Sequence, residues 1–353
     1  MNLELACFVS PHGFGHATRT IALLQALQNR IPGLTANLFT TVPPSLFQSS
    51  GIDHSYHPLS TDVGLVQRDA FTEDREQTQA KLAELLPFAP SLINRAAELC
   101  RSCQLIVCDI SCLGIEVGKV ATIPTLLIEN FTWDWIYSQM GQDSGLEPYI
   151  ELLAESYGKA DFRIQTEPVC TRIACDLNCA PLARRWITPP DEIRAEVTAG
   201  ERKIVLISMG GVALEMPFWA EMQKHQEYLF LVAGQSRDGL LEDNIGLIGT
   251  NSALYHPDLI NAADLLICKS GYSTIAECQQ TATPVCCVTR EDFAESRVIE
   301  RYVSEEMNGT VIDENYFFSG NWLGDLGRMA TRERAPLPVN GADQAAEFIL
   351  SIL

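Results

Sequence analysis

Short apolar runs alternate with stretches of helical periodicity through the first half of the chain. The apolar runs that predict strands are residues 3–10, 34–42, 104–110, 125–130 and 160–166. The stretches that predict helices lie near residues 17–29, 73–101, 112–121 and 133–157. Because buried strands separated by helices are typical of parallel sheets, this half predicts an α/β domain over residues 1–180.

A second series of the same kind follows an interruption. The interruption is residues 175–193, a segment rich in Pro, Arg and turn residues, in which Pro189 and Pro190 predict the start of a helix. Further apolar runs predict strands at residues 203–211, 228–234, 245–249, 264–270, 284–289 and 309–313. We therefore expect a linker over 181–200 and a second α/β domain over 201–353. A last helix, predicted over 341–353, is expected to pack back on the first domain.

Composition and charge narrow the possible functions. The chain has 353 residues (39.0 kDa), enough for two domains at about 150 residues each. Its formal net charge is −20. Residues 1–170 have 10 basic and 19 acidic side chains, and the remaining residues have 15 basic and 26 acidic ones. Because neither half is basic, a nucleic-acid partner is not expected, nor is strong association with an anionic membrane.

The sequence also indicates the compartment. The first residues carry an acid at Glu4 and no basic segment, so they do not read as a signal peptide, and no run of 18 apolar residues predicts a membrane span. A cytoplasmic location is therefore expected, with the 12 cysteines as free thiols. Four of them (Cys100, Cys103, Cys108 and Cys112) have spacings that faintly suggest a metal site. Buried packing is favoured, because Cys108 lies inside a predicted strand, along which side chains alternate.

A glycine loop follows the first predicted strand and runs directly into a helix. It reads Pro-His-Gly-Phe-Gly-His-Ala-Thr-Arg over residues 11–19, and such loops let a backbone approach an anion closely. A dinucleotide site is not indicated, because the third glycine is replaced by Thr18 and no acid occurs between Glu4 and Asp53. The loop presents His16, which is either a general base near neutral pH or a residue that caps the helix. His12 is expected to be structural or to orient a substrate.

The second half repeats this strand, glycine turn and helix arrangement. Residues 264–270 lead into a turn and helix over 271–277, with Lys269 close to the turn. Ser273 and Thr274 are helix caps, or else belong to a helix start that binds a diphosphate through its backbone N–H groups. Glu277, one turn further on, is placed to accept hydrogen bonds from a ribose. A second glycine turn contains Gly210 and Gly211, and no P-loop pattern occurs.

These motifs resemble those of the GT-B glycosyltransferases. The likeness is to the group that contains MurG and the PseG-type nucleotide-sugar hydrolases, and it is greater to the glycosyltransferase-like N-terminal region of plant L-arabinokinase. It spans nearly the whole chain and is carried by segments 12–19, 129–137 and 270–296. The implied fold is GT-B, with two facing Rossmann-like parallel-sheet domains and an interdomain cleft. Kinase activity is not implied, because the kinase half of that plant protein has no counterpart here.

The resemblance also implies roles for individual residues. His16 matches the base that deprotonates the acceptor hydroxyl, and Asp109, placed at a strand end, is either its orienting partner or a plain cap. Residues implied to bind the donor nucleotide are Gly210, Gly211, Leu254, Tyr255, Ser270, Gly271, Ser273, Thr274 and Glu277. Arg290 and Glu295 are candidates for the donor sugar, or else belong to a solvated helix start.

The remaining candidates belong to the acceptor side and its loop. They are His12, Gly13, Gly15, Arg19, Trp133 and Trp135. The two tryptophans either stack on a sugar ring or pack inside the domain. Where the lipid-II enzyme has paired glutamines, this chain has Glu295 and Ser296, so the sugar cannot be carried over from that enzyme.

Together these features predict a metal-independent, inverting glycosyltransferase. It would use a nucleotide-diphosphate sugar, expected to be uridine-based, and a soluble acceptor, without a further cofactor. Two alternatives remain open: a nucleotide-sugar hydrolase on the same scaffold, and a non-catalytic nucleotide-sugar sensor.

Overall fold

The computed structural model describes residues 3–48, 50–68, 72–141, 145–210, 216–290, 293–330 and 339–353. It divides into two compact units, each built around its own sheet. Unit 1 contains Met1–Arg68, Thr72–Ala183 and Asn340–Leu353, and unit 2 contains Arg184–Val339. Along the described residues, the chain passes from unit 1 to unit 2 at Arg184 and returns to unit 1 at Asn340.

Unit 1 holds a seven-stranded parallel sheet in the order β3-β2-β1-β4-β5-β6-β7. Its strands are β1 (Leu3–Val9), β2 (Leu34–Thr40), β3 (His54–Pro58), β4 (Leu105–Asp109), β5 (Thr125–Glu129), β6 (Phe162–Thr166) and β7 (Leu177–Cys179). Its helices are α1 (Gly15–Gln28), α2 (Ser45–Gln48), α3 (Arg75–Leu85), α4 (Pro90–Leu99), α5 (Cys112–Ala121), α6 (Trp133–Ser138), α7 (Glu147–Tyr157) and α15 (Gly341–Ile352). The order reverses between β1 and β4, where doubly wound sheets bind their ligands.

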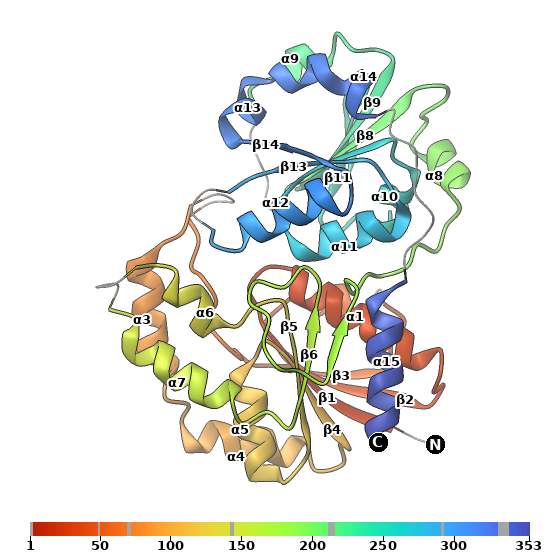
Figure 1. Ribbon diagram of the computed structural model, residues 1–353. Coiled ribbons are helices and arrows are strands. Elements are labelled where there is room, and N and C mark those ends of the chain that lie inside the picture. The colour runs from red at the N-terminus through yellow and green to blue at the C-terminus, as the bar shows by residue number, and fades with distance from the viewer. Residues whose placement is uncertain are drawn as a thin grey trace. The chain divides into compact units, whose positions relative to one another are not determined.

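The last helix completes the core of unit 1. Figure 1 shows α15 beside α1 although they are at opposite ends of the chain, and Ala345, Ala346 and Ile349 of α15 are fully buried. Gly341 begins α15, and a Cβ there would lie 1.7 Å from the carbonyl oxygen of Ala180. Only glycine therefore fits where the returning chain meets this loop.

Unit 2 holds a second seven-stranded sheet, in the order β10-β11-β9-β8-β12-β13-β14. Its strands are β8 (Lys203–Ser208), β9 (Tyr228–Gln235), β10 (Gly239–Glu242), β11 (Ile245–Gly249), β12 (Leu265–Lys269), β13 (Val285–Val288) and β14 (Thr310–Ile312). Its helices are α8 (Pro190–Glu196), α9 (Trp219–Met222), α10 (His256–Ala262), α11 (Tyr272–Thr281), α12 (Ser296–Glu305), α13 (Glu314–Ser319), a 3₁₀ helix (Asn321–Asp325) and α14 (Leu326–Met329). The edge strand β10 is antiparallel to β11, so this sheet is not purely parallel as expected.

The predicted α/β class is confirmed, and the differences have local causes. The helix predicted over 73–101 is interrupted between α3 and α4, where Pro87 follows a cis peptide bond and Pro90 begins α4. Proline removes a backbone donor and cannot continue a helix. The short edge strands β3, β7 and β10 were not expected, because none is fully buried and their sequences lack a long apolar run. Within the described ranges, none of the helices has the length and hydropathy needed to cross a bilayer.

Candidate functional site

The glycine loop of unit 1 lies at the point where the strand order reverses. Strands β1 and β4 are neighbours, with Val9 paired to Asp109 at their carboxyl ends. The loop after β1 turns at Gly13, which has a φ of +70° that a side chain would disfavour. Helix α1 then begins at Gly15, so His16 lies in its first turn next to the end of β4.

His16 and Asp109 form a buried pair. His16 Nδ1 lies 2.7 Å from Asp109 Oδ1, and the two residues are 8% and 2% exposed. Because an ionised carboxylate only accepts hydrogen bonds, Nδ1 carries the proton of a neutral His16, and Nε2 then has a free lone pair. The structure thus places Asp109 against the histidine. The helix-cap position belongs instead to Phe14, which makes no side-chain cap.

Arg19 holds Asp109 in this position. Its Nε donates to Asp109 Oδ2 at 2.8 Å and its Nη2 to Oδ1 at 2.5 Å. Burial alone would raise the pKa of the Asp109 carboxyl, but the charge of Arg19 and the hydrogen bonds from Arg19 and His16 outweigh it and hold that pKa below its usual value. Arg19 is itself 5% exposed, so the structure places it behind the histidine rather than at an open surface.

Asn130, which the sequence reasoning missed, extends the same network. Its Oδ1 accepts a hydrogen bond from Arg19 Nη1, and its Nδ2 donates to the carbonyl oxygens of Thr166 and Pro168. Asn130 directly follows β5, as Asp109 ends the neighbouring strand β4. That shared position, one polar residue at the end of each buried strand, was the signal available in the sequence.

His12 and Trp133 lie together inside unit 1. Their ring centroids are 5.2 Å apart, edge to face, and the Leu65 N–H donates to His12 Nδ1 at 3.3 Å. Trp133 is 1% exposed, so it packs inside the domain as one alternative expected, whereas Trp135 is half-buried. Gly64 has room only for hydrogen, because a Cβ there would lie 2.7 Å from the His12 side chain.

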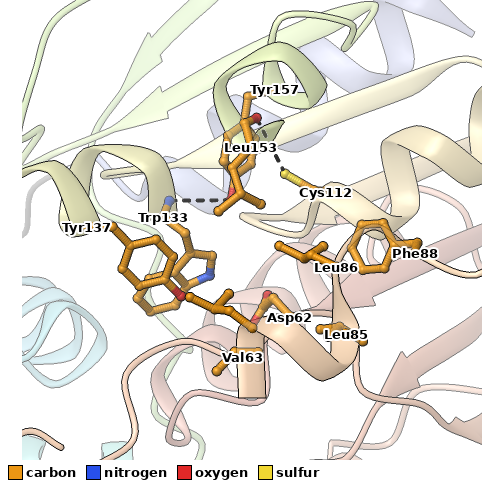
Figure 2. A pocket seen from close by; sticks show the side chains of 11 residues that line it. Asp62, Val63, Leu85, Leu86, Phe88, Cys112, Trp133, Tyr137, Leu153 and Tyr157 are labelled. Atoms are coloured by element: carbon orange, nitrogen blue, oxygen red, sulfur yellow. Dashed lines mark hydrogen bonds between the residues drawn. The ribbon is translucent and has the colours of Figure 1, made fainter. Parts of the chain in front are cut away.

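A small cavity lies behind Trp133 and contains a second residue that was missed. Figure 2 shows Asp62 and Trp133 on its wall among leucine and aromatic side chains. Asp62 accepts from the Ser10 hydroxyl at 2.8 Å, but its Oδ2 has no hydrogen-bond partner among the described residues. Burial raises the pKa of Asp62 to about 7. Asp62 is therefore a carboxyl group held in a mostly apolar environment.

In unit 2, the predicted donor-binding turn joins β12 to α11. Gly271 occupies the N-cap position of α11, no side chain caps the helix, and Ser273 and Thr274 are half-buried in its first turn. They are therefore not the caps that one alternative expected. Ser270 is fully buried, and its hydroxyl lies 2.8 Å from that of Ser296. The uncapped start of a helix is an environment that favours anions.

A positive charge lies between this turn and the glycine turn after β8. A Cβ on Gly210 would lie 2.5 Å from Cε and 2.9 Å from Nζ of Lys269, and Gly210 has a φ of +72°. Lys269 has no hydrogen-bond or ion-pair partner among the described residues. Burial, together with the charge of Arg290, lowers the pKa of Lys269 to about 8. Gly211 lies outside the described residues.

Arg290 and Glu295 are buried and paired. Arg290 Nη2 lies 3.2 Å from Glu295 Oε1 and 2.9 Å from the carbonyl oxygen of Ser270, and the guanidinium stacks 3.7 Å from the ring centre of Phe293. Both are 6% exposed, so the alternative of a solvated helix start is wrong. Glu295 Oε2 is buried and has no hydrogen-bond partner among the described residues.

Glu277 lies inside unit 2 and is already held by two side chains. Its Oε1 accepts from Arg184 Nε at 2.6 Å, and its Oε2 lies 3.0 Å from His256 Nδ1. Glu277 is 2% exposed, so a ribose would have to reach a carboxylate that these partners cover. The Arg184 guanidinium carbon lies over the Tyr255 ring, 5.1 Å from the ring centre. Leu254 packs against the neighbouring apolar core.

The cysteines form no recognisable metal centre in the described part of the chain. All 12 are free thiols, and 10 of them, including Cys100, Cys103, Cys108 and Cys112, are buried. No group of three or more His, Cys, Asp or Glu side chains is arranged to hold a metal ion among the described residues.

Comparisons with known proteins agree with this architecture. No family model matches the chain. L-arabinokinase of Arabidopsis thaliana is 26% identical over an alignment of 362 positions that covers 99% of this chain. The chain spans about a third (34%) of the length of that relative.

Solved glycosyltransferases share the fold over their whole length. CalG4, the calicheamicin glycosyltransferase, matches with a TM-score of 0.65 and 14% identity, covering 99% of this chain and 98% of its own. MurG of Acinetobacter baumannii matches with a TM-score of 0.57 and 14% identity over 99% of both chains. UGT71G1 of Medicago truncatula, solved with UDP-glucose, matches with a TM-score of 0.57 and 15% identity over 99% of this chain and 97% of its own. The chain therefore has the GT-B glycosyltransferase fold. Over 99% of its own length it is also distantly homologous to L-arabinokinase.

Proposed function

We propose that this protein is a metal-independent, inverting glycosyltransferase that moves a sugar from a nucleotide diphosphate to a hydroxyl group of a soluble acceptor. UDP is the proposed nucleotide, since one protein of the same fold was solved with UDP-glucose. The observation that carries the proposal is the buried pair of His16 and Asp109 at the switch point of the first sheet. That pair leaves Nε2 as a proton acceptor, as a general base requires.

In the proposed reaction, unit 1 supplies the base. The acceptor hydroxyl gives its proton to His16 Nε2, and its oxygen attacks the anomeric carbon from the face opposite the diphosphate. The bond from that carbon to the diphosphate oxygen breaks, and the diphosphate leaves with the electron pair. Asp109 stabilises the imidazolium that forms, because Arg19, which is itself held by Asn130, keeps the carboxylate ionised and fixed.

Unit 2 is proposed to hold the donor. The uncapped start of α11 and the Lys269 ammonium would bind the diphosphate and stabilise the charge that develops as it leaves. Because the start of α11 and the Lys269 ammonium would together stabilise the negative charge of the diphosphate, the proposed reaction needs no metal ion. Glu295 Oε2, which has no partner among the described residues, is proposed to accept a hydrogen bond from a hydroxyl of the donor sugar.

The first experiment identifies the nucleotide. Thermal unfolding is followed with UDP, dTDP, GDP, CDP and ADP, first without metal and then with Mg²⁺, because a ligand that binds the folded state raises the Tm. We expect a shift with UDP that does not need Mg²⁺. If none of the five nucleotides changes the Tm, the proposed donor site is wrong.

The second experiment tests the reaction. UDP release is measured from UDP-sugars with and without a panel of soluble hydroxyl acceptors, for the wild type and for His16→Ala. The matched control is His54→Ala, since His54 lies on the edge strand β3. We expect acceptor-dependent UDP release that is lost in His16→Ala and kept in His54→Ala. Free sugar formed without an acceptor would indicate the hydrolase instead, and binding without turnover would indicate the sensor.

A further inference from the structure

A second histidine-centred chain of hydrogen bonds lies in unit 2. The Ser208 hydroxyl lies 2.9 Å from His256 Nε2, and His256 Nδ1 lies 3.0 Å from Glu277 Oε2. The three residues come from different elements: Ser208 ends β8, His256 begins α10, and Glu277 lies in α11. None of the proposed transfer steps uses Ser208 or His256.

The hydrogen-bonding capacities of these groups fix where the protons lie. Burial alone would raise the pKa of Glu277, but the charge of Arg184 and the hydrogen bond from His256 outweigh it and hold that pKa below its usual value. The ionised carboxylate accepts the Nδ1 proton of His256, so Nε2 accepts the proton of the Ser208 hydroxyl. This order of serine, histidine and acid, with both separations between 2.6 and 3.2 Å, is the arrangement that activates a serine for attack.

Arg184 fixes the acid of this chain. Its Nε lies 2.6 Å from Glu277 Oε1, and both side chains are almost fully buried. The His256 side chain is 27% exposed, whereas that of Glu277 is 3% exposed. Ser208 is itself 5% exposed, so His256 is the member of this chain of hydrogen bonds that reaches solvent.

Positive charge also lies beside the serine. Ser208 pairs with Cys268, the residue before Lys269, and Gly210 follows Ser208 by two positions. Gly210 has no side chain, and the Lys269 ammonium occupies the space that a Cβ would fill. When Ser208 attacks an ester, the oxyanion that forms on the carbonyl oxygen would thus lie near a cation, which is the kind of stabilisation that acyl transfer needs.

We propose that Ser208, His256 and Glu277 form a nucleophilic triad in unit 2, with small carboxylic esters as its class of substrate. The Ser208 oxygen attacks the ester carbonyl carbon while its proton passes to His256 Nε2. The bond from that carbon to the alkoxy oxygen then breaks, and the alcohol leaves with the proton from His256. Water hydrolyses the acyl-serine by the same steps, which releases the acid and restores the triad.

Covalent labelling tests this proposal without any sugar nucleotide, so its failure is separate from failure of the transferase. The full chain is incubated with a fluorophosphonate probe, and the modified peptide is identified by mass spectrometry. Attack by the Ser208 oxygen on phosphorus would release fluoride and leave the probe on the serine. We expect one labelled site, Ser208, and no labelling in Ser208→Ala. The control variant Ser304→Ala removes a serine on helix α12 and should label as the wild type does.

A second readout separates activation from simple accessibility. Glu277→Gln keeps the shape of the acid but removes its charge, and should slow labelling by at least about 100-fold, in line with the loss when the acid of a serine triad is made neutral. Hydrolysis of p-nitrophenyl acetate should fall in parallel, with circular dichroism showing that the variant is folded. Labelling that is absent in the wild type, falls on another residue, or is equally fast in folded Glu277→Gln would overturn the triad.

Discussion

His16 Nδ1 lies 2.7 Å from Asp109 Oδ1, although 93 positions separate the two residues in the sequence. The contact exists because β1 and β4 are neighbours in the sheet and α1 begins beside the end of β4. Arg19, one helical turn after His16, reaches the same carboxylate. The proposed base, its proposed orienting acid and the cation that keeps the acid ionised are thus assembled from two short segments.

Removing the charge of Asp109 should impair catalysis more than binding. Asp109→Asn keeps the shape of the side chain but no longer fixes the proton on His16 Nδ1 or stabilises the imidazolium. We expect kcat to fall by roughly 10²- to 10⁴-fold, by comparison with the same change in a serine triad. The affinity for UDP, measured by calorimetry, should stay within about twofold. Unchanged kcat in the variant would rule out Asp109 as the orienting acid.

Arg19 should contribute mainly to stability. Arg19→Met leaves the Asp109 carboxylate buried without its principal partner, and breaking a buried ion pair in this way costs about 3 to 5 kcal/mol of unfolding free energy. The matched control is Arg30→Met, whose ion pairs with Asp343 and Glu347 are partly exposed and should contribute about 1 kcal/mol or less. Urea unfolding of both variants measures the difference. Equal losses would contradict the special role of the buried pair.

Asp62 should make stability depend on pH. Its pKa is about 7 in the folded protein, because burial raises it from an unfolded value of about 3.9. Between these values the unfolded chain releases the proton while the folded protein keeps it, so the free energy of unfolding falls as the pH rises from about 4 to about 7. A shift of about three pKa units corresponds to about 4 kcal/mol.

The variant Asp62→Asn isolates this contribution. It lacks the titrating group and so escapes the loss of stability that the wild type suffers as the pH rises. The difference in unfolding free energy, variant minus wild type, should therefore increase by a few kcal/mol between pH 4.5 and pH 8. Other groups titrate alike in the two proteins and cancel in the difference. Urea unfolding at both pH values provides the measurement. Parallel pH profiles would show that Asp62 is already ionised at low pH in the folded protein.

Lys269 should determine much of the affinity for UDP. A hydrogen bond to a charged group contributes about 1.5 to 3 kcal/mol, so Lys269→Met should raise the Kd for UDP by roughly 10- to 100-fold. Because its pKa is about 8 in the free protein, wild-type affinity should weaken as the pH rises above 8, and the variant should lose this dependence. Calorimetry at pH 7 and pH 9 tests both points.

A surface lysine provides the control for that measurement. Lys224→Met removes an exposed ammonium paired with Glu221, so UDP affinity and its pH dependence should match those of the wild type. If Lys269→Met bound UDP as tightly as Lys224→Met, the diphosphate would have to bind elsewhere.

The sequence alone determined the elements and the fold class. Strands such as β1, β4 and β12 are continuous apolar runs, and a buried run between helical stretches has few other ways to fold. The glycine loop before α1 and the turn before α11 were also visible, because glycine marks places where a backbone needs a positive φ or a close approach. The whole-chain likeness to L-arabinokinase and the GT-B fold, both expected from motifs, are confirmed.

Only the tertiary structure decided which side chains meet. Asn130 reaches Arg19 across 111 positions, and Arg184 reaches Glu277 across 93, through strand order and burial that no local pattern encodes. Burial also placed Trp133 and Arg290 inside their units, although each was a candidate for contact with a sugar. Hydrogen bonding and ionisation depend on neighbours within a few ångströms, and these neighbours are set by packing between distant segments. The sequence could therefore name the polar residues at strand ends, but not the partners that give them their chemistry.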